Sequence, residues 1–111
     1  MAEAIGYFHE SDLTHRDLKP KNVMIVPGES NPPGPVVIMD FGLVRKMDGT
    51  ALTQTGALLG TPLYVPPEQA VGGKMDKRSD IFQAGLICYE MLTGNRPFMA
   101  DSLQELVALC I

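Results

Sequence analysis

The chain has 111 residues, of which 45% are hydrophobic, and its 9 Lys and Arg residues against 13 Asp and Glu residues give a formal net charge of −4. This length suits one small domain at most, and the lack of a basic excess argues against a nucleic-acid-binding protein. No run approaches the roughly 20 apolar residues that cross a bilayer, and no signal peptide is visible at Met1, so we expect no membrane segment within this chain.

Residues 1–11 are predicted to form a helix, because Ala4, Ile5 and Phe8 fall near one face and no proline interrupts them. No capping residue precedes this helix, so the sequence is expected to begin inside an element. A last predicted helix, with Asp101 as its N-cap, runs to the other end without a stop signal. Both ends therefore suggest a fragment of a longer protein.

The next feature is a stretch of eight residues, 15–22, that reads His-Arg-Asp-Leu-Lys-Pro-Lys-Asn. It offers a carboxylate at Asp17, a point charge at Lys19 and an amide oxygen at Asn22. Pro20 fixes its own φ and biases the preceding residue toward an extended conformation. The turn that separates the carboxylate from the amide is therefore expected to be stiff.

Two short β-branched runs, 23–26 and 36–39, flank a segment rich in proline and glycine. This pattern predicts a β-hairpin whose second strand delivers Asp40, the first residue of Asp-Phe-Gly. The strand pair should place Asn22 and Asp40 on one side. Amide and carboxylate oxygens suit a hard cation such as Mg²⁺, although Asp-Phe-Gly alone is a common loop tripeptide.

Taken in order, these two motifs resemble the catalytic loop (15–22) and the metal-binding segment (40–42) of a protein kinase. The resemblance implies that the γ-phosphoryl group of ATP is transferred with the help of Mg²⁺. It assigns the proton acceptor to Asp17, charge stabilisation at the γ-phosphate to Lys19, and Mg²⁺ ligation beside the nucleotide to Asn22 and Asp40.

The activation segment implied by the resemblance spans 40–68. Within it, residues 42–60 show no lasting periodicity, which predicts a surface loop. A phosphate on Thr53 or Thr55 would add a charge of about −1.5 to −2. Arg16, beside the catalytic carboxylate, is a candidate partner for that phosphate, and such pairing would order the loop.

Residues 60–69 resemble the segment that shapes the substrate groove, with Pro66 where the family more often has a small residue. Thr61 and Lys19 together favour serine or threonine as the phosphate acceptor. The continuation Glu-Gln-Ala at 68–70 looks most like the bacterial branch of eukaryotic-like serine/threonine kinases.

The clearest predicted helix is 79–92, with Ser79 as its N-cap. Its apolar residues are spread around nearly the whole circumference of the helix, so the helix is expected to be buried. The resemblance implies that Asp80 holds the backbone of the catalytic loop, whereas the residues alone are equally compatible with a helix-capping carboxylate. It also implies that His15 is a packed structural histidine and not a base or a ligand.

The expected fold is α+β and mainly helical, with a short β-hairpin carrying the catalytic and metal-binding loops, as in the C-terminal lobe of a protein kinase. The parts that bind ATP in this family are missing from 1–111. So is the region that supplies an arginine partner for Glu68. We therefore expect a partial kinase domain that is at best marginally folded and inactive alone.

Three functions remain open. The first is a serine/threonine protein kinase, acting in a full-length parent. The second is a non-catalytic, kinase-like interaction module, and the third is a small-molecule kinase related to aminoglycoside phosphotransferases. Lys19 and the segment 60–68 favour the first, with ATP, Mg²⁺ and a protein substrate carrying Ser or Thr as partners.

The setting of the chain is expected to be cytoplasmic and reducing. Cys88 and Cys110 have neither the spacing of a metal site nor the density of a disulfide scaffold. A membrane anchor elsewhere in a longer parent, and dimerisation of that parent, are left open.

Overall fold

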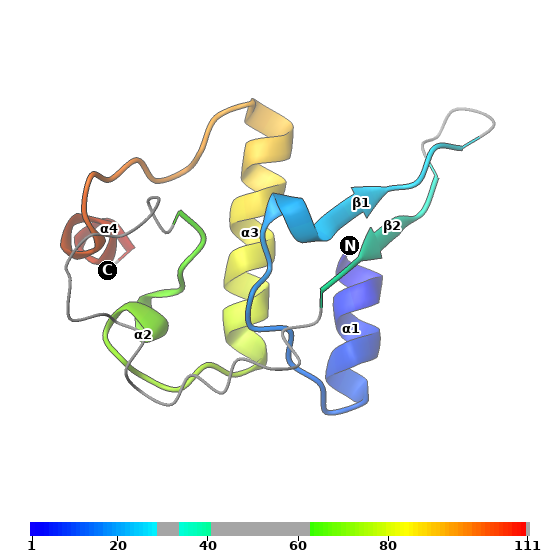
Figure 1. The fold of residues 1–111 in the computed structure, drawn as a ribbon, viewed down its shortest axis with the longest axis horizontal. Helices are drawn as coiled ribbons and strands as arrows, with labels where there is room; N and C mark the ends of the chain where they lie inside the picture. Colours follow the sequence, from blue (N-terminus) through cyan, green and yellow to red (C-terminus); the bar gives the residue numbers. More distant parts are fainter. Residues whose placement is uncertain (29–33, 41–62, 111) are drawn as a thin grey trace.

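The computed structural model describes residues 1–28, 34–40 and 63–110. These ranges contain helices and a two-stranded antiparallel sheet. The elements are α1 (Ala2–Glu10), a 3₁₀ turn (Pro20–Asn22), β1 (Val23–Ile25), β2 (Val36–Ile38), α2 (Pro67–Ala70), α3 (Lys77–Thr93) and α4 (Leu103–Cys110). In Figure 1, α3 stands at the centre, with α1 and the hairpin on one side and α2 and α4 on the other. The mixture of helices with one small sheet agrees with the expected fold class.

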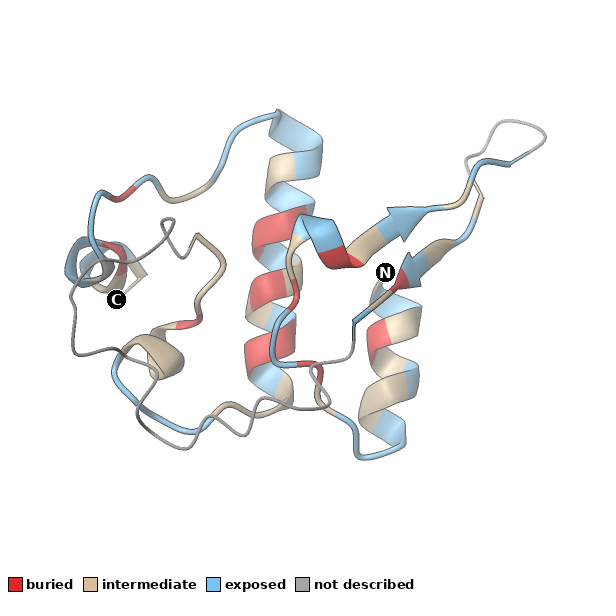
Figure 2. Ribbon diagram, in the orientation of Figure 1, coloured by how far each residue is buried: buried red, intermediate tan, exposed pale blue. Residues whose placement is uncertain are grey.

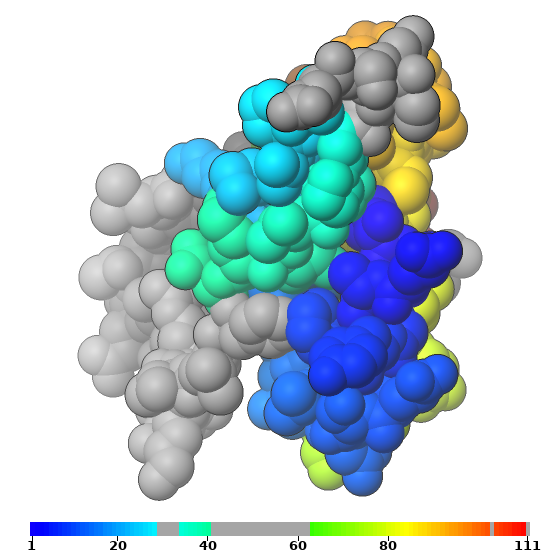
Figure 3. All heavy atoms as spheres, turned by 90° about the vertical axis from the view of Figure 1, so that its right-hand side faces the viewer, coloured from blue at the N-terminus to red at the C-terminus, as the bar shows by residue number. Residues whose placement is uncertain are grey.

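The predicted N-terminal helix and hairpin are confirmed. β1 and β2 pair with Val23 opposite Ile38 and Ile25 opposite Val36, each strand being one residue shorter than expected. Alternation along β2 turns Ile38 inward and leaves Val37 exposed, as in a half-buried strand, whereas Met24 and Ile25 of β1 are both exposed. Figure 3 looks onto the side where the hairpin lies against α1.

The core joins α1, the loop before the 3₁₀ turn, β2 and α3 through four buried side chains. These are Ile5, Leu18, Ile38 and Ile87. Each such burial stabilises the fold by about 1.5–3 kcal/mol. Figure 2 shows buried residues along α3 and on the loop that crosses it. Leu18 therefore anchors the loop that carries the predicted catalytic residues.

The helix predicted at 79–92 begins two residues earlier than expected, at Lys77. Its N-cap is Asp76, whose carboxylate accepts a hydrogen bond from the backbone N–H of Arg78 at 2.8 Å. Ser79 is the third residue of the helix, and its hydroxyl accepts from the backbone N–H of Asp76 at 3.1 Å. The pair forms a reciprocal capping box, so Ser79 is not the N-cap.

The expectation that this helix is buried all round is wrong. Leu86 and Ile87 are buried, but Ile81 is 57% exposed and Leu92 is 86% exposed. Among the described residues, α1 and the loop bearing Leu18 pack only on the side of α3 that carries Ile87.

α4, in contrast, begins later than predicted, at Leu103. Ser102 Oγ accepts a hydrogen bond from the N–H of Glu105 at 3.1 Å, and the Ser102 carbonyl accepts from Leu106 at 3.0 Å. Ser102 therefore acts as the N-cap in place of Asp101. Across the described residues, the helices all fall short of the length and apolar content needed to traverse a bilayer.

Candidate active site

The turn between the predicted base and the predicted amide ligand is held at both ends. Lys19 is extended (φ −157°, ψ 162°), as the residue before a proline should be, and Pro20 starts the 3₁₀ turn. The turn closes with a hydrogen bond from Asn22 N–H to the Lys19 carbonyl at 2.9 Å. The side chain of Asn22 is buried and donates from Nδ2 to the Asp17 carbonyl at 2.8 Å. Asn22 therefore ties the end of the turn back to Asp17.

The hairpin brings Asp40 to the same end of the structure. The N–H of Met39 donates to the carbonyl of Asn22 at 2.8 Å, which extends the pairing of β1 and β2 toward the turn. Asp40 follows at once, exposed and with a φ of 53°. This left-handed backbone is uncommon for a residue with a side chain and costs about 1–2 kcal/mol.

His15 joins the loop to the hairpin. Its ring is buried, and Nε2 donates to the Met39 carbonyl at 3.0 Å. A carbonyl can only accept, so Nε2 carries the hydrogen and Nδ1 is left to accept from the N–H of Asp17 at 3.3 Å. The expectation of a packed, hydrogen-bonded structural histidine is confirmed.

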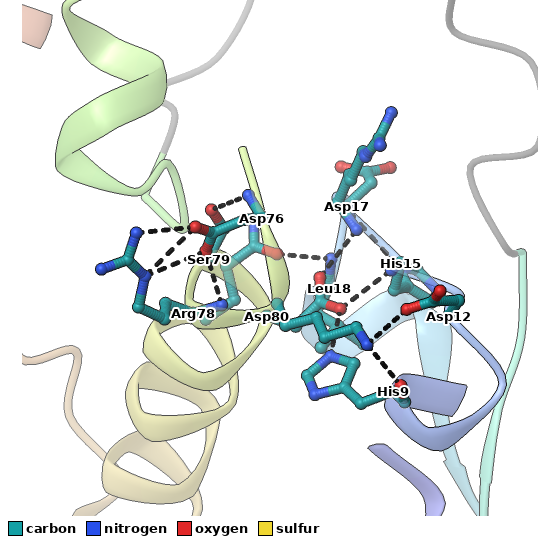
Figure 4. Close-up of polar contacts among 12 residues, drawn as sticks. His9, Asp12, His15, Asp17, Leu18, Asp76, Arg78, Ser79 and Asp80 are labelled. Atoms are coloured by element: carbon teal, nitrogen blue, oxygen red, sulfur yellow. Dashed lines mark hydrogen bonds and ion pairs between the residues drawn. The ribbon is translucent and has the colours of Figure 1, made fainter. Parts of the chain in front are cut away.

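Asp80, from the first turn of α3, is buried and accepts hydrogen bonds from three donors. They are the N–H of His15 at 2.9 Å, the N–H of Arg16 at 2.8 Å and Nε2 of His9 at 2.8 Å. Figure 4 shows the side chains of His9, His15 and Asp80 gathered between α3 and the loop. Arg16 has a φ of 66°, a conformation that is unfavourable for a residue with a side chain. Asp80 therefore binds the loop at a residue whose backbone is strained.

The contact of Asp80 with His9 was missed by sequence reasoning. The two residues are 71 positions apart, and no local pattern connects the end of α1 to the start of α3. Nearby, Lys77 Nζ donates to the His9 carbonyl at 2.6 Å and to Asp12 Oδ1 at 2.7 Å. The ammonium group of Lys77 lowers the pKa of Asp12, first through this hydrogen bond and then through its charge.

Gln83 was also missed by sequence reasoning. It is buried one turn further along α3, and its Oε1 accepts from the N–H of Leu18 at 3.0 Å. With this bond, each of the four successive N–H groups of residues 15–18 has a side-chain acceptor. The loop is thus held in place by α3 and by His15 in the absence of any regular secondary structure.

Lys19 lies against the predicted base. Its Nζ donates to Asp17 Oδ2 at 2.8 Å, with the two side chains 40% and 53% exposed. An ion pair as open to solvent as this one contributes less than about 1 kcal/mol. Lys19 can therefore exchange this partner for another anion at little cost.

Residues 1–110 match the family model described as the protein kinase domain. The chain belongs to this family. Serine/threonine-protein kinase PknB of Mycobacterium leprae is 44% identical over 101 residues, which cover 90% of this chain and 15% of that relative. The probable kinase PknB of Bifidobacterium longum is 46% identical over 101 residues, with 89% and 14% covered.

A third relative, serine/threonine-protein kinase PknL of Mycobacterium tuberculosis, is 45% identical over 94 residues, covering 85% of this chain and 22% of the relative. The expected membership of the bacterial eukaryotic-like serine/threonine kinases is confirmed. The chain spans only 14–22% of the length of these kinases.

Two further polar contacts of this kinase chain join α3 to residues 63–70. Glu68 is half-buried in α2 and accepts a hydrogen bond from the hydroxyl of Ser79. The hydroxyl of Tyr64 donates to Glu90. Burial, followed by this bond and the negative charge of Glu90, raises the pKa of Tyr64.

Several predicted site residues lie outside the described residues: Thr53, Thr55, Thr61, and the Phe-Gly that follows Asp40. Within 1–28, 34–40 and 63–110, no group of three or more His, Cys, Asp or Glu side chains is placed to hold a metal ion by itself. Asn22 and Asp40 are instead an amide and a carboxylate at one end of a hairpin. That donor set fits Mg²⁺, which takes one or two protein oxygens together with phosphate and water.

Proposed function

We propose that residues 1–111 form the catalytic part of the C-terminal lobe of a serine/threonine protein kinase, which transfers the γ-phosphoryl group of ATP to protein hydroxyls. The observation that carries this proposal is a pair of hydrogen bonds made by Asn22. Its side chain donates to the carbonyl of Asp17, and its own carbonyl accepts from Met39, the residue before Asp40. Because the matched kinases are several times longer, the proposal concerns a full-length kinase that contains these residues.

In the proposed reaction, Asp17 accepts the proton of a serine or threonine hydroxyl. The hydroxyl oxygen forms a bond to the γ-phosphorus while the bond to the β-phosphate oxygen breaks and ADP leaves. Lys19, released from its exposed pair with Asp17, would neutralise charge on the moving phosphoryl group. The stiff turn supplies alignment, which is a large part of catalysis in this reaction class.

Asn22 and Asp40 would hold Mg²⁺ through the carboxamide oxygen and the carboxylate. The hydrogen bond from Asn22 Nδ2 to the Asp17 carbonyl fixes the orientation of that carboxamide. When bound, the ion neutralises negative charge on the nucleotide phosphates. The left-handed backbone of Asp40 supports a special role for this residue, since such conformations are concentrated at functional sites.

Regulation is proposed to act through the segment that follows the hairpin. A phosphate on Thr53 or Thr55 would pair with Arg16, whose side chain is exposed and whose N–H is bound by Asp80. Thr61 would line the groove for the protein substrate.

The test is phosphate transfer from labelled ATP to a protein substrate by the full-length kinase and its Asp17→Asn variant. Loss of the general base should lower kcat by about 10²- to 10⁴-fold without changing the fold seen by circular dichroism. Asp101→Asn, the same change at an exposed position, should leave kcat unaltered. Retained turnover in Asp17→Asn would refute the assignment and favour a non-catalytic module.

A further inference from the structure

Gln83 connects two segments that are far apart in the sequence. It is 3% exposed, and its carboxamide oxygen accepts from the N–H of Leu18 at 3.0 Å. Its carboxamide nitrogen donates to the carbonyl of Tyr64, also at 3.0 Å. Leu18 directly follows Asp17, and Tyr64 belongs to the segment 60–69 that resembles the substrate groove. One buried side chain, which we call the Gln83 bridge, therefore links the two.

The chemistry of the bridge requires a carboxamide. A backbone N–H can only donate and a carbonyl can only accept, so the oxygen of Gln83 must face Leu18 and its nitrogen must face Tyr64. Neither a hydrocarbon nor a carboxylate can do both. Because Gln83 is almost fully buried, water cannot readily replace it, and its loss would leave two backbone groups without their partners.

The bridge makes neither of its hydrogen bonds directly to a proposed metal ligand, although the Leu18 N–H belongs to the same peptide group as the Asp17 carbonyl that binds Asn22. One of its contacts is to the residue that follows Asp17, and the other is to Tyr64, in the segment that resembles the substrate groove. Because the Tyr64 end of the bridge lies in that segment, we expect a change at Gln83 to affect the acceptor more than the nucleotide.

We infer that Gln83 is a positioning residue for phosphoryl transfer, which sets the spacing between the loop of Asp17 and the segment around Tyr64 on which the protein substrate docks. This inference rests on the proposed kinase function. It adds to that function a determinant of how the acceptor hydroxyl approaches the base.

The experiment compares Gln83→Met and Gln83→Glu in the full-length kinase. Methionine has a similar volume but cannot make either bond, whereas glutamate keeps an acceptor for Leu18 and places an oxygen against the Tyr64 carbonyl. Gln104→Met makes the first change at an exposed position of α4 and serves as the matched control. Asp17→Asn reports whether the measured transfer belongs to the proposed site.

We expect both Gln83 variants to lower kcat/KM for the protein substrate by about 10- to 100-fold, because small misplacements of a reacting group have effects of this size. KM for ATP should change by less than about twofold. Loss of folded enzyme would not produce this difference between the protein substrate and ATP. Hydrogen exchange of the Leu18 amide should become faster in Gln83→Met and stay slow in Gln83→Glu. Gln104→Met should match the wild type in all three measurements.

The inference is overturned if both variants keep kcat/KM within about twofold of wild type, or if KM for ATP rises as much as KM for the protein. Should Gln83→Met fail to fold, Gln83→Glu decides by the same criteria. If the wild type shows no transfer that Asp17→Asn removes, the kinase function itself has failed. The exchange rate of Leu18 would still report whether the Gln83 bridge forms.

Discussion

The backbone N–H groups of residues 15–18 lie in neither a strand nor a helix, and side chains supply their acceptors instead. Asp80 accepts two of them and Gln83 a third. The remaining one, from Asp17, donates to the ring of His15. A buried N–H without an acceptor costs about 1–3 kcal/mol, so these side chains decide the conformation of the loop.

Asp80→Asn tests this dependence at a single residue. The amide keeps the shape of the carboxylate but replaces one acceptor oxygen with a donor, which would then face one of the three donors now bound there. We expect a loss of about 1–3 kcal/mol in the free energy of unfolding, together with a lower kcat, measured by urea denaturation and phosphate transfer. Asp101→Asn is the control. Equal stability of the two variants would contradict the proposed role of Asp80.

At the scale of elements, α3 is the support to which the loop and α1 are attached. Its end is as well defined as its start, because Gly94 adopts a φ of 71° and its N–H closes the helix on the carbonyl of Glu90. Only glycine takes this left-handed backbone without strain.

Two glycine replacements on α3 should therefore act in opposite directions. Beyond the adjoining backbone, a Cβ at either Gly85 or Gly94 would meet none of the described residues within 4 Å, so the two sites differ mainly in backbone conformation. Gly94→Ala should lower the free energy of unfolding by about 1–2 kcal/mol. Gly85→Ala, inside the helix, should raise it by about 0.5–1 kcal/mol. Thermal denaturation of the two variants checks this, and shifts of the same sign would contradict it.

The packing of α3 against the loop is tested at Ile87, which lies with Leu18 in the core. Ile87→Ala should cost about 2–5 kcal/mol, because the methyl groups removed leave a cavity among buried neighbours. Leu92→Ala, on the same helix but 86% exposed, should change stability by less than about 0.5 kcal/mol. Urea denaturation measures both, and similar losses would show that Ile87 is not in the core.

The sequence predicted those features that depend on local patterns. The hairpin, the extended Lys19 before Pro20 and the terminal helices follow from periodicity and turn residues. The cap at Asp76 was missed because Ser79, three residues later, is itself of a residue type that is common at N-caps. The Gln83 bridge could not be predicted, since its partners lie 65 and 19 residues away and only the fold brings them together.

For the whole molecule, two carboxylates link stability to acid pH. The pKa of Asp12 is lowered by Lys77, and that of Asp76 by its hydrogen bonds to Arg78, from an ordinary value of 3.8. Since both groups bind protons more weakly in the folded state, they stabilise it above that value. Their contribution is lost as the pH falls through the lowered pKa values.

We therefore expect the free energy of unfolding to fall as the pH drops below about 4, and to fall less steeply in the double variant Asp12→Asn, Asp76→Asn. Asparagine is a suitable N-cap, so the start of α3 should be retained at position 76. Urea denaturation over a series of acid pH values gives the slopes. Identical slopes in the wild type and the double variant would contradict the assignment.

The central claim is that two carboxylates, Asp17 and Asp40, have different tasks, one as base and one as metal ligand. Titration of Mn²⁺ by electron paramagnetic resonance, with a non-hydrolysable ATP analogue bound to the full-length kinase, separates them, because Mn²⁺ accepts the same oxygen ligands as Mg²⁺. We expect Asp17→Asn to bind Mn²⁺ as the wild type does and Asp40→Asn to bind it at least about tenfold more weakly. Wild-type affinity in Asp40→Asn, or a loss confined to Asp17→Asn, would contradict the proposed site.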